Sequence, residues 1–206
     1  DQLPLAKTNR SFAKFGLETL NKTSRAGLLS LFKEAGIEKG VITSYTVGYV
    51  IAPRLNAMGR ILHAVDSLRL LCTKNTSRAN DLAKIIGKTN LQRQKIVEEV
   101  IGIARESVKL GDGSGVIIIS HESFHEGVIG LAAAKLVEEF YRPCVVFYRG
   151  GEFCKASARS IPGFNIIETI RKFESFLIEG GGHPMAAGFT IKTADLEEFT
   201  KKFQEE

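Results

Sequence analysis

The chain has 206 residues, of which 44% are hydrophobic and 25% are charged, and its formal net charge is +5. A chain of this length and composition can bury a core, which excludes an intrinsically disordered protein. No apolar run approaches the roughly 20 residues that a membrane span needs, and no basic segment followed by an apolar stretch begins the chain, so we expect a soluble, cytoplasmic protein.

The charge is divided unevenly along the chain. Residues 1–110 contain 18 Lys and Arg against 9 Asp and Glu, whereas residues 111–206 contain 10 against 14. A basic N-terminal half suits contact with a phosphate backbone but also serves solubility, and charge alone does not separate the two. Cys72, Cys144 and Cys154 lack CxxC spacing, which favours buried, inert thiols over disulfides or zinc ligands.

The first half of the sequence predicts helices. Apolar residues recur at helical spacing over 28–35, with Gly36 as a C-cap, and a shorter apolar stripe over 47–51 precedes Pro53. Further helices are predicted over 66–72 and 77–86. Over 91–108 apolar residues repeat at i, i+3, i+4, i+7 and i+11 with charged residues between them, which predicts a long amphipathic connector helix.

The second half predicts alternating strands and helices. The Gly-Asp-Gly-Ser-Gly turn at 111–115 separates a helical region, 1–110, from an α/β region, 111–206. Strands are expected over 116–119, 143–148, 153–160 and 187–191. Helices are expected over 129–140, 166–172 and 196–203, the second of them with Asn165 as its N-cap. This alternation predicts an α/β fold with a mixed sheet.

The segment from Gly180 to Gly188 contains the triplet Gly180-Gly181-Gly182, followed by His183. Glycines permit positive φ and let a ligand approach the main chain, so exposed N–H groups beside an imidazole suit phosphate oxygens. The alternative is a glycine-rich turn before a buried strand. As a lone histidine, His183 could contact phosphate, stack on a base or be a hydrogen-bonded core residue, and we favour phosphate contact.

Two other segments offer cationic side chains. Arg54 and Arg60 flank a short segment that contains Asn56, and both guanidinium groups could fork onto phosphate oxygens; the alternative is a helix end with solvated arginines. Ser157 and Arg159 alternate along an expected strand, which places both side chains on one face as a small phosphate clamp, although surface pairing is the alternative.

His121-Glu122-Ser123-Phe124-His125 satisfies the HExxH pattern of zinc proteases. That motif requires one continuous helix so that both histidines face the same metal. Here the segment follows a strand-like run and precedes Gly127, and we expect a helix to begin near Gly127. We therefore interpret it as a loop that leads into a helix, whose free N–H groups could bind an anion or be capped.

Four ordered motifs resemble a known family over nearly the whole chain. The run from Gly181 to Gly188 is similar to the GGHxxAAG signature of the DHHA1 domain, the nucleic-acid-binding partner of DHH-family phosphoesterases. Segments 51–60, 125–130 and 157–165 resemble the RecJ-like branch, which comprises exonucleases specific for single-stranded DNA, and residues 90–94 resemble its connecting helix. The family's loop usually reads Trp-His-Pro-Gly; His125 matches it, whereas Phe124 and Glu126 depart from it.

The resemblance implies a helical linker followed by a DHHA1-type α/β domain of an enzyme that hydrolyses phosphodiester bonds from the 5′ end in DNA repair and recombination. The family binds two Mn²⁺ or Mg²⁺ ions through Asp-rich motifs and an Asp-His-His triplet. This sequence has neither that triplet nor an Asp-x-Asp pair, so we expect a C-terminal piece without catalytic residues or metal ligands. The nucleic-acid-binding residues implied are Arg54, Asn56, Arg60, His125, Ser157, Arg159, Gly181, Gly182 and His183.

Two other functions stay open. The first is a phosphodiesterase of the same class that acts on short oligonucleotides or cyclic dinucleotides. The second is a non-catalytic RNA-binding module like that attached to alanyl-tRNA synthetases. Single-stranded DNA is the expected partner, a helicase or single-strand-binding protein is implied only by the resemblance, and the absence of tryptophan predicts limited base stacking.

Overall fold

The computed structural model describes residues 3–108 and 115–206. The chain forms two compact units, Asp1–Arg93 and Gln94–Glu206, which are described separately below. The division lies inside a helix rather than at the predicted turn over 111–115, most of which falls outside the described residues. The domain boundary at 110/111 therefore stays a prediction.

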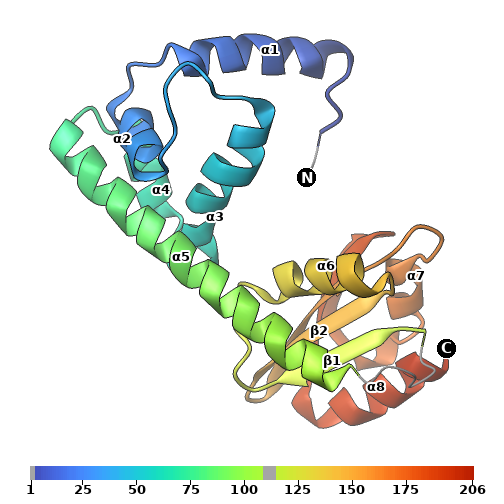
Figure 1. Ribbon diagram of the computed structural model, residues 1–206. Coiled ribbons are helices and arrows are strands. Elements are labelled where there is room, and N and C mark those ends of the chain that lie inside the picture. Colours follow the sequence, from blue (N-terminus) through green and yellow to red (C-terminus); the bar gives the residue numbers. More distant parts are fainter. Residues whose placement is uncertain (1–2, 109–114) are drawn as a thin grey trace. The chain divides into compact units, whose positions relative to one another are not determined.

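The first unit is helical, as predicted (Figure 1). Its elements are α1 (Lys7–Asn21), α2 (Ala26–Glu34), a π-helical turn η1 (Thr46–Ile51), α3 (Ala52–Ile61), α4 (Val65–Cys72) and the first part of α5 (Thr76–Ser107). Leu31, Met58, Leu70 and Ile86 are at most 1% exposed and belong to its core. A Cβ atom on Gly27 would lie 1.8 Å from the Leu70 carbonyl oxygen, so this glycine lets α2 and α4 pack in direct contact.

The second unit contains the rest of α5 and a five-stranded mixed sheet in the order β1-β2-β3-β5-β4. The strands are β1 (Ile117–His121), β2 (Cys144–Gly150), β3 (Phe153–Arg159), β4 (Leu177–His183) and β5 (Ala186–Lys192). Strands β1 and β2 are parallel, and the other pairs are antiparallel. The helices are α6 (Ile129–Phe140), α7 (Ile166–Arg171) and α8 (Leu196–Glu205), with short 3₁₀ turns η2 (Glu174–Phe176) and η3 (Thr193–Asp195).

The two faces of this sheet are covered differently. In Figure 1, α6 lies on one face and α8 on the other. The α8 face carries the core, in which rings of β2, β5 and α8 pack edge-on: Phe147 lies 5.5 Å from Phe189 and 5.9 Å from Phe199, between ring centroids. On the opposite face α6 packs on β2 and β3, which leaves the β5 and β4 side of that face for a site.

Several local expectations need correction. Helix α1 was not predicted, because none of its residues is buried and its apolar residues do not mark an obvious core face. The glycine run is strand β4 and not a turn or loop. Cys144 and Cys154 are buried as expected, but Cys72 is exposed. Asn165 occupies the N-cap position of α7, yet its side chain makes no capping bond and its Oδ1 is buried without a partner.

Among the described residues, no helix is both long and apolar enough to cross a membrane. The segment from His121 to His125 is the end of β1 followed by a turn, as expected, and not a helix. The two imidazoles are therefore not spaced by one helical turn, as a zinc-protease motif would require.

Candidate nucleic-acid interface

The register of β3, β5 and β4 arranges the candidate residues in rows on the open face of the sheet. Alternate residues of a strand point to the same face, and directly paired residues share that face. The rows are Arg159–Ala186–His183, Ser157–Gly188–Gly181 and Lys155–Thr190–Glu179. The structure thus brings Arg159, Ser157, Gly181 and His183, which are far apart in sequence, to one surface.

Arg159 and Ser157 lie on one face of β3, as their spacing predicted, and are hydrogen-bonded to each other. The Arg159 Nη1 group donates to Ser157 Oγ at 3.1 Å and to the Ala158 carbonyl at 2.8 Å. Helix α6 approaches them closely, because a Cβ atom on Gly130 would lie 2.8 Å from Ser157 Oγ and 3.0 Å from Arg159 Nη2. A larger residue would crowd the ends of these two side chains, so Gly130 leaves room for them between the sheet and the helix.

The glycines of β4 serve two different purposes. None of Gly180, Gly181 and Gly182 has a positive φ, so conformational freedom is not the reason for the run. A Cβ atom on Gly182 would lie 2.4 Å from the Ala186 carbonyl oxygen and 2.6 Å from the Ala187 Cα, so this glycine is required for the pairing of β4 with β5. A Cβ atom on Gly181 would meet nothing within 4 Å and would project from the open face. Of the two predicted glycines, only Gly181 therefore keeps that face flat.

His183 ends β4, and Pro184 and Met185 form the turn to β5. Its side chain is exposed, which removes the interpretation of His183 as a core residue. Because neighbouring strands lie about 4.8 Å apart, its Cα lies roughly 10 Å from that of Arg159 at the other end of the same row. This spacing is wider than one repeat of an extended nucleic-acid backbone, and it suits groups on opposite sides of one nucleotide.

His125 lies in the loop between β1 and α6, which is anchored by Phe124, 2% exposed. The Gly127 N–H donates to His125 Nδ1 at 3.1 Å. A neutral imidazole that accepts at Nδ1 carries its proton on Nε2, so this contact leaves Nε2 as a donor for an anion. The substitution of Phe124 at the family's tryptophan position gives a buried anchor and no exposed stacking ring.

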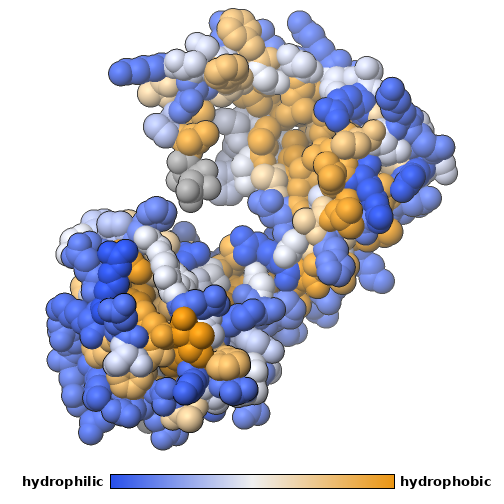
Figure 2. Space-filling model, turned by 180° about the vertical axis from the view of Figure 1, so that it is seen from behind, coloured by the Kyte–Doolittle hydropathy of each residue, from blue (hydrophilic) through white to orange (hydrophobic). Residues whose placement is uncertain are grey.

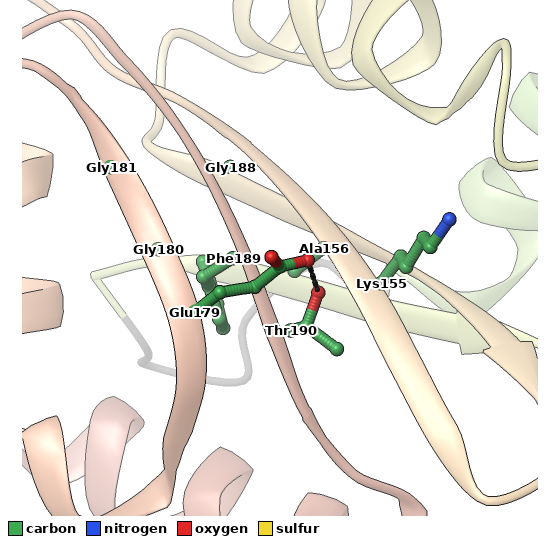
Figure 3. Close-up of a pocket in the computed structure, with 8 residues that line it drawn as sticks. All are labelled: Lys155, Ala156, Glu179, Gly180, Gly181, Gly188, Phe189 and Thr190. Atoms are coloured by element: carbon green, nitrogen blue, oxygen red, sulfur yellow. Dashed lines mark hydrogen bonds between the residues drawn. The ribbon is translucent and has the colours of Figure 1, made fainter.

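An open groove of about 440 Å³ lies on this part of the sheet (Figure 3), and of the predicted site residues only Gly181 lines it. Its lining comes from β3, β4 and β5 and consists of Lys155, Ala156, Glu179, Gly180, Gly181, Gly188, Phe189 and Thr190. Gly188 and Lys155 were not predicted as site residues. The sequence signals were present, since Gly188 completes the GGHxxAAG run and Lys155 precedes Ser157 by one strand period.

In the first unit, Arg54 is held by groups of its own unit. Its Nε donates to Glu34 Oε2 at 3.0 Å, its Nη1 donates to the Val50 carbonyl at 3.0 Å, and both charged side chains are only about a fifth exposed. Gly87 makes room for the carboxylate, because a Cβ atom there would lie 1.8 Å from Glu34 Oε1. The charge of Arg54 is therefore neutralised within its own unit. The sequence did not predict this pairing, because Glu34 lies 20 residues before Arg54 in the chain.

Asn56 and Arg60 are exposed and four residues apart, so they share one face of α3. Arg93 on α5 completes a basic cluster that sequence reasoning did not assign. Burial lowers the pKa of Arg93, and the positive charges of Arg60 and Arg54 lower it further. Arg93 Nη2 donates to Asn90 Oδ1 at 2.6 Å. The guanidinium groups of Arg54, Arg60 and Arg93 together form a region that favours an anion, and the Glu34 carboxylate is paired with Arg54.

An aromatic surface lies just before Arg54 in the chain. The rings of Tyr45 and Tyr49 stack with centroids 4.7 Å apart, and the two residues are 66% and 69% exposed. Composition did not predict this surface, because the count of aromatic residues does not show which are exposed. It offers a face on which a base could stack.

Comparison with known proteins agrees with this geometry. Residues 113–206 match the family model described as the DHHA1 domain. Over its full length the chain is 40% identical to the single-stranded-DNA-specific exonuclease RecJ of Bacillus subtilis, of which it spans 26%. Over 99% of its length it is 30% identical to the protein of the same name from Thermus thermophilus, of which it spans 29%.

Solved structures give the same result. The crystal structure of RecJ from Thermus thermophilus with Mg²⁺ matches 98% of this chain with a TM-score of 0.89 and 28% identity, over 32% of that protein. A crystal structure of exonuclease RecJ bound to manganese matches with a TM-score of 0.84 and 29% identity, over 50% of that protein.

The C-terminal part of this chain is therefore a DHHA1 domain with a five-stranded mixed sheet. More particularly, the whole chain is homologous to a region of the RecJ exonucleases, of which it covers about a quarter to two fifths.

Proposed function

We propose that this chain is the nucleic-acid-binding portion of a single-stranded-DNA-specific 5′→3′ exonuclease that acts in DNA repair and recombination. The observation that carries the proposal is the arrangement of Arg159, Ser157, Gly181 and His183 on one open sheet face in a chain that is 40% identical to RecJ throughout. Guanidinium, hydroxyl and imidazole groups on a flat surface suit backbone phosphates, which are the same for every base.

The parts of the chain would contribute in different ways. Arg159 would neutralise a phosphate and His183 would donate a hydrogen bond to one on the same sheet face as the groove, while Gly181 would let the strand lie against the sheet. In the first unit, Arg60 and Asn56 would contact phosphates, and Tyr45 or Tyr49 would stack on a base. Such contacts position a strand without reading its sequence, which is what an exonuclease of general specificity needs.

We assign the hydrolytic step to a longer protein that would contain this chain as its nucleic-acid-binding region. We propose that the complete protein uses the ions present in the solved relatives, Mg²⁺ or Mn²⁺. Within residues 3–108 and 115–206 no group of three or more His, Cys, Asp or Glu side chains could hold a metal ion. We therefore assign no metal-dependent step to the side chains of these described residues.

Binding measurements test the proposal. Fluorescence anisotropy would compare oligothymidylate, duplex DNA, tRNA and a cyclic dinucleotide between about 50 and 200 mM salt, the range over which phosphate contacts weaken strongly. We expect the single strand to bind best. If Arg60 and Arg159 each neutralise one phosphate and Arg54, which is paired with Glu34, contributes less, the slope of log affinity against log salt would lie between about −1.4 and −2, from about 0.7 per contact.

Other outcomes would favour other functions. Tighter binding of tRNA would support an RNA-binding module, and tighter binding of the cyclic dinucleotide would support a small-substrate phosphodiesterase. Salt-independent binding to all four ligands would overturn the phosphate-contact account. In parallel, we expect the isolated chain with Mn²⁺ or Mg²⁺ to release no nucleotides from DNA.

A further inference from the structure

Lys155 lies in the groove, in the same face and strand as Ser157 and Arg159. It occupies the third row, opposite Thr190 and Glu179. The three side chains at positions 155, 157 and 159 project from alternate residues, so their Cα atoms are spaced by about 6.6 Å along β3. That is close to the repeat of an extended nucleic-acid backbone, and Lys155 is placed to extend the line of phosphate contacts.

The ammonium group of Lys155 forms an ion pair with a carboxylate that lies outside the sheet. Its Nζ lies 2.6 Å from Glu126 Oε2, and the two side chains are 55% and 48% exposed. The other carboxylate of the row, Glu179, instead accepts a hydrogen bond from Thr190 Oγ1 at 3.0 Å. Figure 3 shows the Lys155 ammonium pointing away from the Glu179 carboxylate. Glu126 is thus the group that neutralises Lys155.

The loop that carries Glu126 is held in place on both sides of it. Phe124 is buried, and the Gly127 N–H is bonded to His125. Glu126 itself is exposed, and it accepts a hydrogen bond from Lys155 Nζ. Because Glu126 departs from the proline of the Trp-His-Pro-Gly pattern, this loop can form an ion pair with Lys155. It links the loop that bears His125 to the strand that bears Arg159.

The pair is weak enough for a ligand to exchange it. An exposed Lys–Glu pair contributes on the order of 1 kcal/mol or less, because water and salt screen it and both side chains lose freedom. The hydrogen bond that Lys155 donates to Glu126, followed by the charges of Glu126 and Glu179, raises the pKa of Lys155, so the ammonium is charged at neutral pH. A phosphate oxygen in the groove can take the place of the Glu126 carboxylate oxygen at Lys155, and the ammonium keeps its charge in both arrangements.

We propose that Lys155 is a further phosphate contact of this groove and that Glu126 competes with the nucleic acid for it. The competition limits the affinity of the groove, because binding a phosphate at Lys155 leaves the Glu126 carboxylate unpaired beside the strand. The inference rests on the proposed function, since it requires nucleic acid in the groove. It goes further by naming an internal anion that sets how tightly the groove binds.

The test is Glu126→Gln, which removes the charge but keeps the size and an oxygen acceptor. We expect the affinity of the 206-residue chain for oligothymidylate at low salt to rise about two- to fivefold. The slope of log affinity against log salt should become steeper by about 0.7, because one more ammonium then neutralises a phosphate. Adding Lys155→Gln to this variant should abolish both gains.

The matched control is Glu198→Gln on α8, the helix on the other face of the sheet. Glu198 forms a similar exposed pair with Lys202, at 2.7 Å, so its substitution changes the net charge equally. We expect no steeper slope from this control. If Glu198→Gln raised the affinity for oligothymidylate as much as Glu126→Gln does, the effect would be one of net charge alone, and the proposal would be overturned.

Two further results separate this inference from the function on which it rests. A lower or unchanged affinity for Glu126→Gln, while Arg159→Ala still loses binding, would overturn the role of Glu126 and leave the nucleic-acid groove intact. Unchanged binding in both variants would overturn the groove itself.

Discussion

The helical unit and the sheet unit hold their candidate phosphate ligands in different ways. In the helical unit Arg54 is fixed by Glu34 and the Val50 carbonyl, and Arg93 is partly buried beside other cations. In the sheet unit Arg159, Ser157 and His183 stand on a flat face whose spacing is set by strand register. The two-residue repeat shows which side chains of one strand share a face, whereas the ion pairs of the helical unit depend on long-range packing.

The surfaces of the two units differ as well. Most of the exposed large hydrophobic side chains of the described residues belong to the first unit, among them Phe12, Phe15, Tyr45 and Tyr49. Figure 2 shows apolar side chains reaching the surface of this unit. In the second unit the groove lining combines glycines and polar residues with Ala156 and Phe189. The following variants compare what the two units contribute to stability and to binding.

The largest expected effect separates two adjacent glycines. Gly182→Val places a Cβ atom within 2.7 Å of the Ala187 backbone and Cβ, and we expect it to lower the free energy of unfolding by about 3 kcal/mol or more. Gly181→Val adds the same side chain into open space and should leave the melting temperature nearly unchanged while weakening single-strand binding. Thermal melts and titrations of both variants would test this. Equal destabilisation would contradict the assignment of opposite faces.

The second-largest expected effect is on stability and concerns the ion pair between Arg54 and Glu34 in the helical unit. Arg54→Ala leaves the Glu34 carboxylate, about a fifth exposed, without its cation, and we expect a loss of about 1–2 kcal/mol in urea unfolding. Adding Glu34→Gln should recover part of that loss, because the unpaired charge is removed. A stable Arg54→Ala variant that has lost DNA affinity would instead mean that Arg54 acts mainly on phosphate.

A smaller effect compares arginines across the units by salt dependence. We expect Arg159→Ala and Arg60→Ala each to reduce the slope magnitude for oligothymidylate by about 0.7, with little change in stability or base preference. Arg54→Ala should reduce it less, because Glu34 already neutralises that guanidinium. The comparison fails if all three variants keep the slope of the unmodified chain.

The smallest effect concerns the cysteines. At pH 7.5 maleimide should label exposed Cys72 and spare buried Cys144 and Cys154, whereas all three should react in denaturant. Burial raises the pKa of Cys144 from 9.0 to about 12. A raised pKa means that the folded state favours the thiol, so the stability this group provides is present below pH 9 and falls as pH rises toward 12. Labelling of Cys144 in the folded chain at neutral pH would contradict its burial.

The sequence predicted much of the fold because its signals are local. The apolar periodicity over 91–108, the alternation over 153–160 and the strand over 187–191 each correspond to an observed element. Strand β4 was missed because glycines have low strand propensity and form no apolar alternation. Its reason is visible only in the hairpin, where Gly182 must lie against Ala187.

The candidate site was predicted in part for a similar reason. The shared face of Ser157 and Arg159 follows from their spacing, and His183 follows from its unusual neighbours. The pairing of Arg54 with Glu34 and of Lys155 with Glu126 joins residues 20 and 29 positions apart. No local pattern carries that information, so the charges available to a ligand could not be separated from those already neutralised.

The π-helical turn η1 has a consequence for the evolution of the helical unit. Pro53 lacks an N–H, so the regular bond to the carbonyl of Tyr49 cannot form, and the wide turn over Thr46–Ile51 precedes it. Rewinding this turn as α-helix at constant length would rotate the segment before it by about 100° relative to α3. Deleting one residue at the same time would restore the phase. We therefore expect that relatives differing by one residue between Thr46 and Ile51 also differ in whether this turn is π-helical or α-helical. A change of one residue in the length of this segment should mark the lineages that have gained or lost the wide turn.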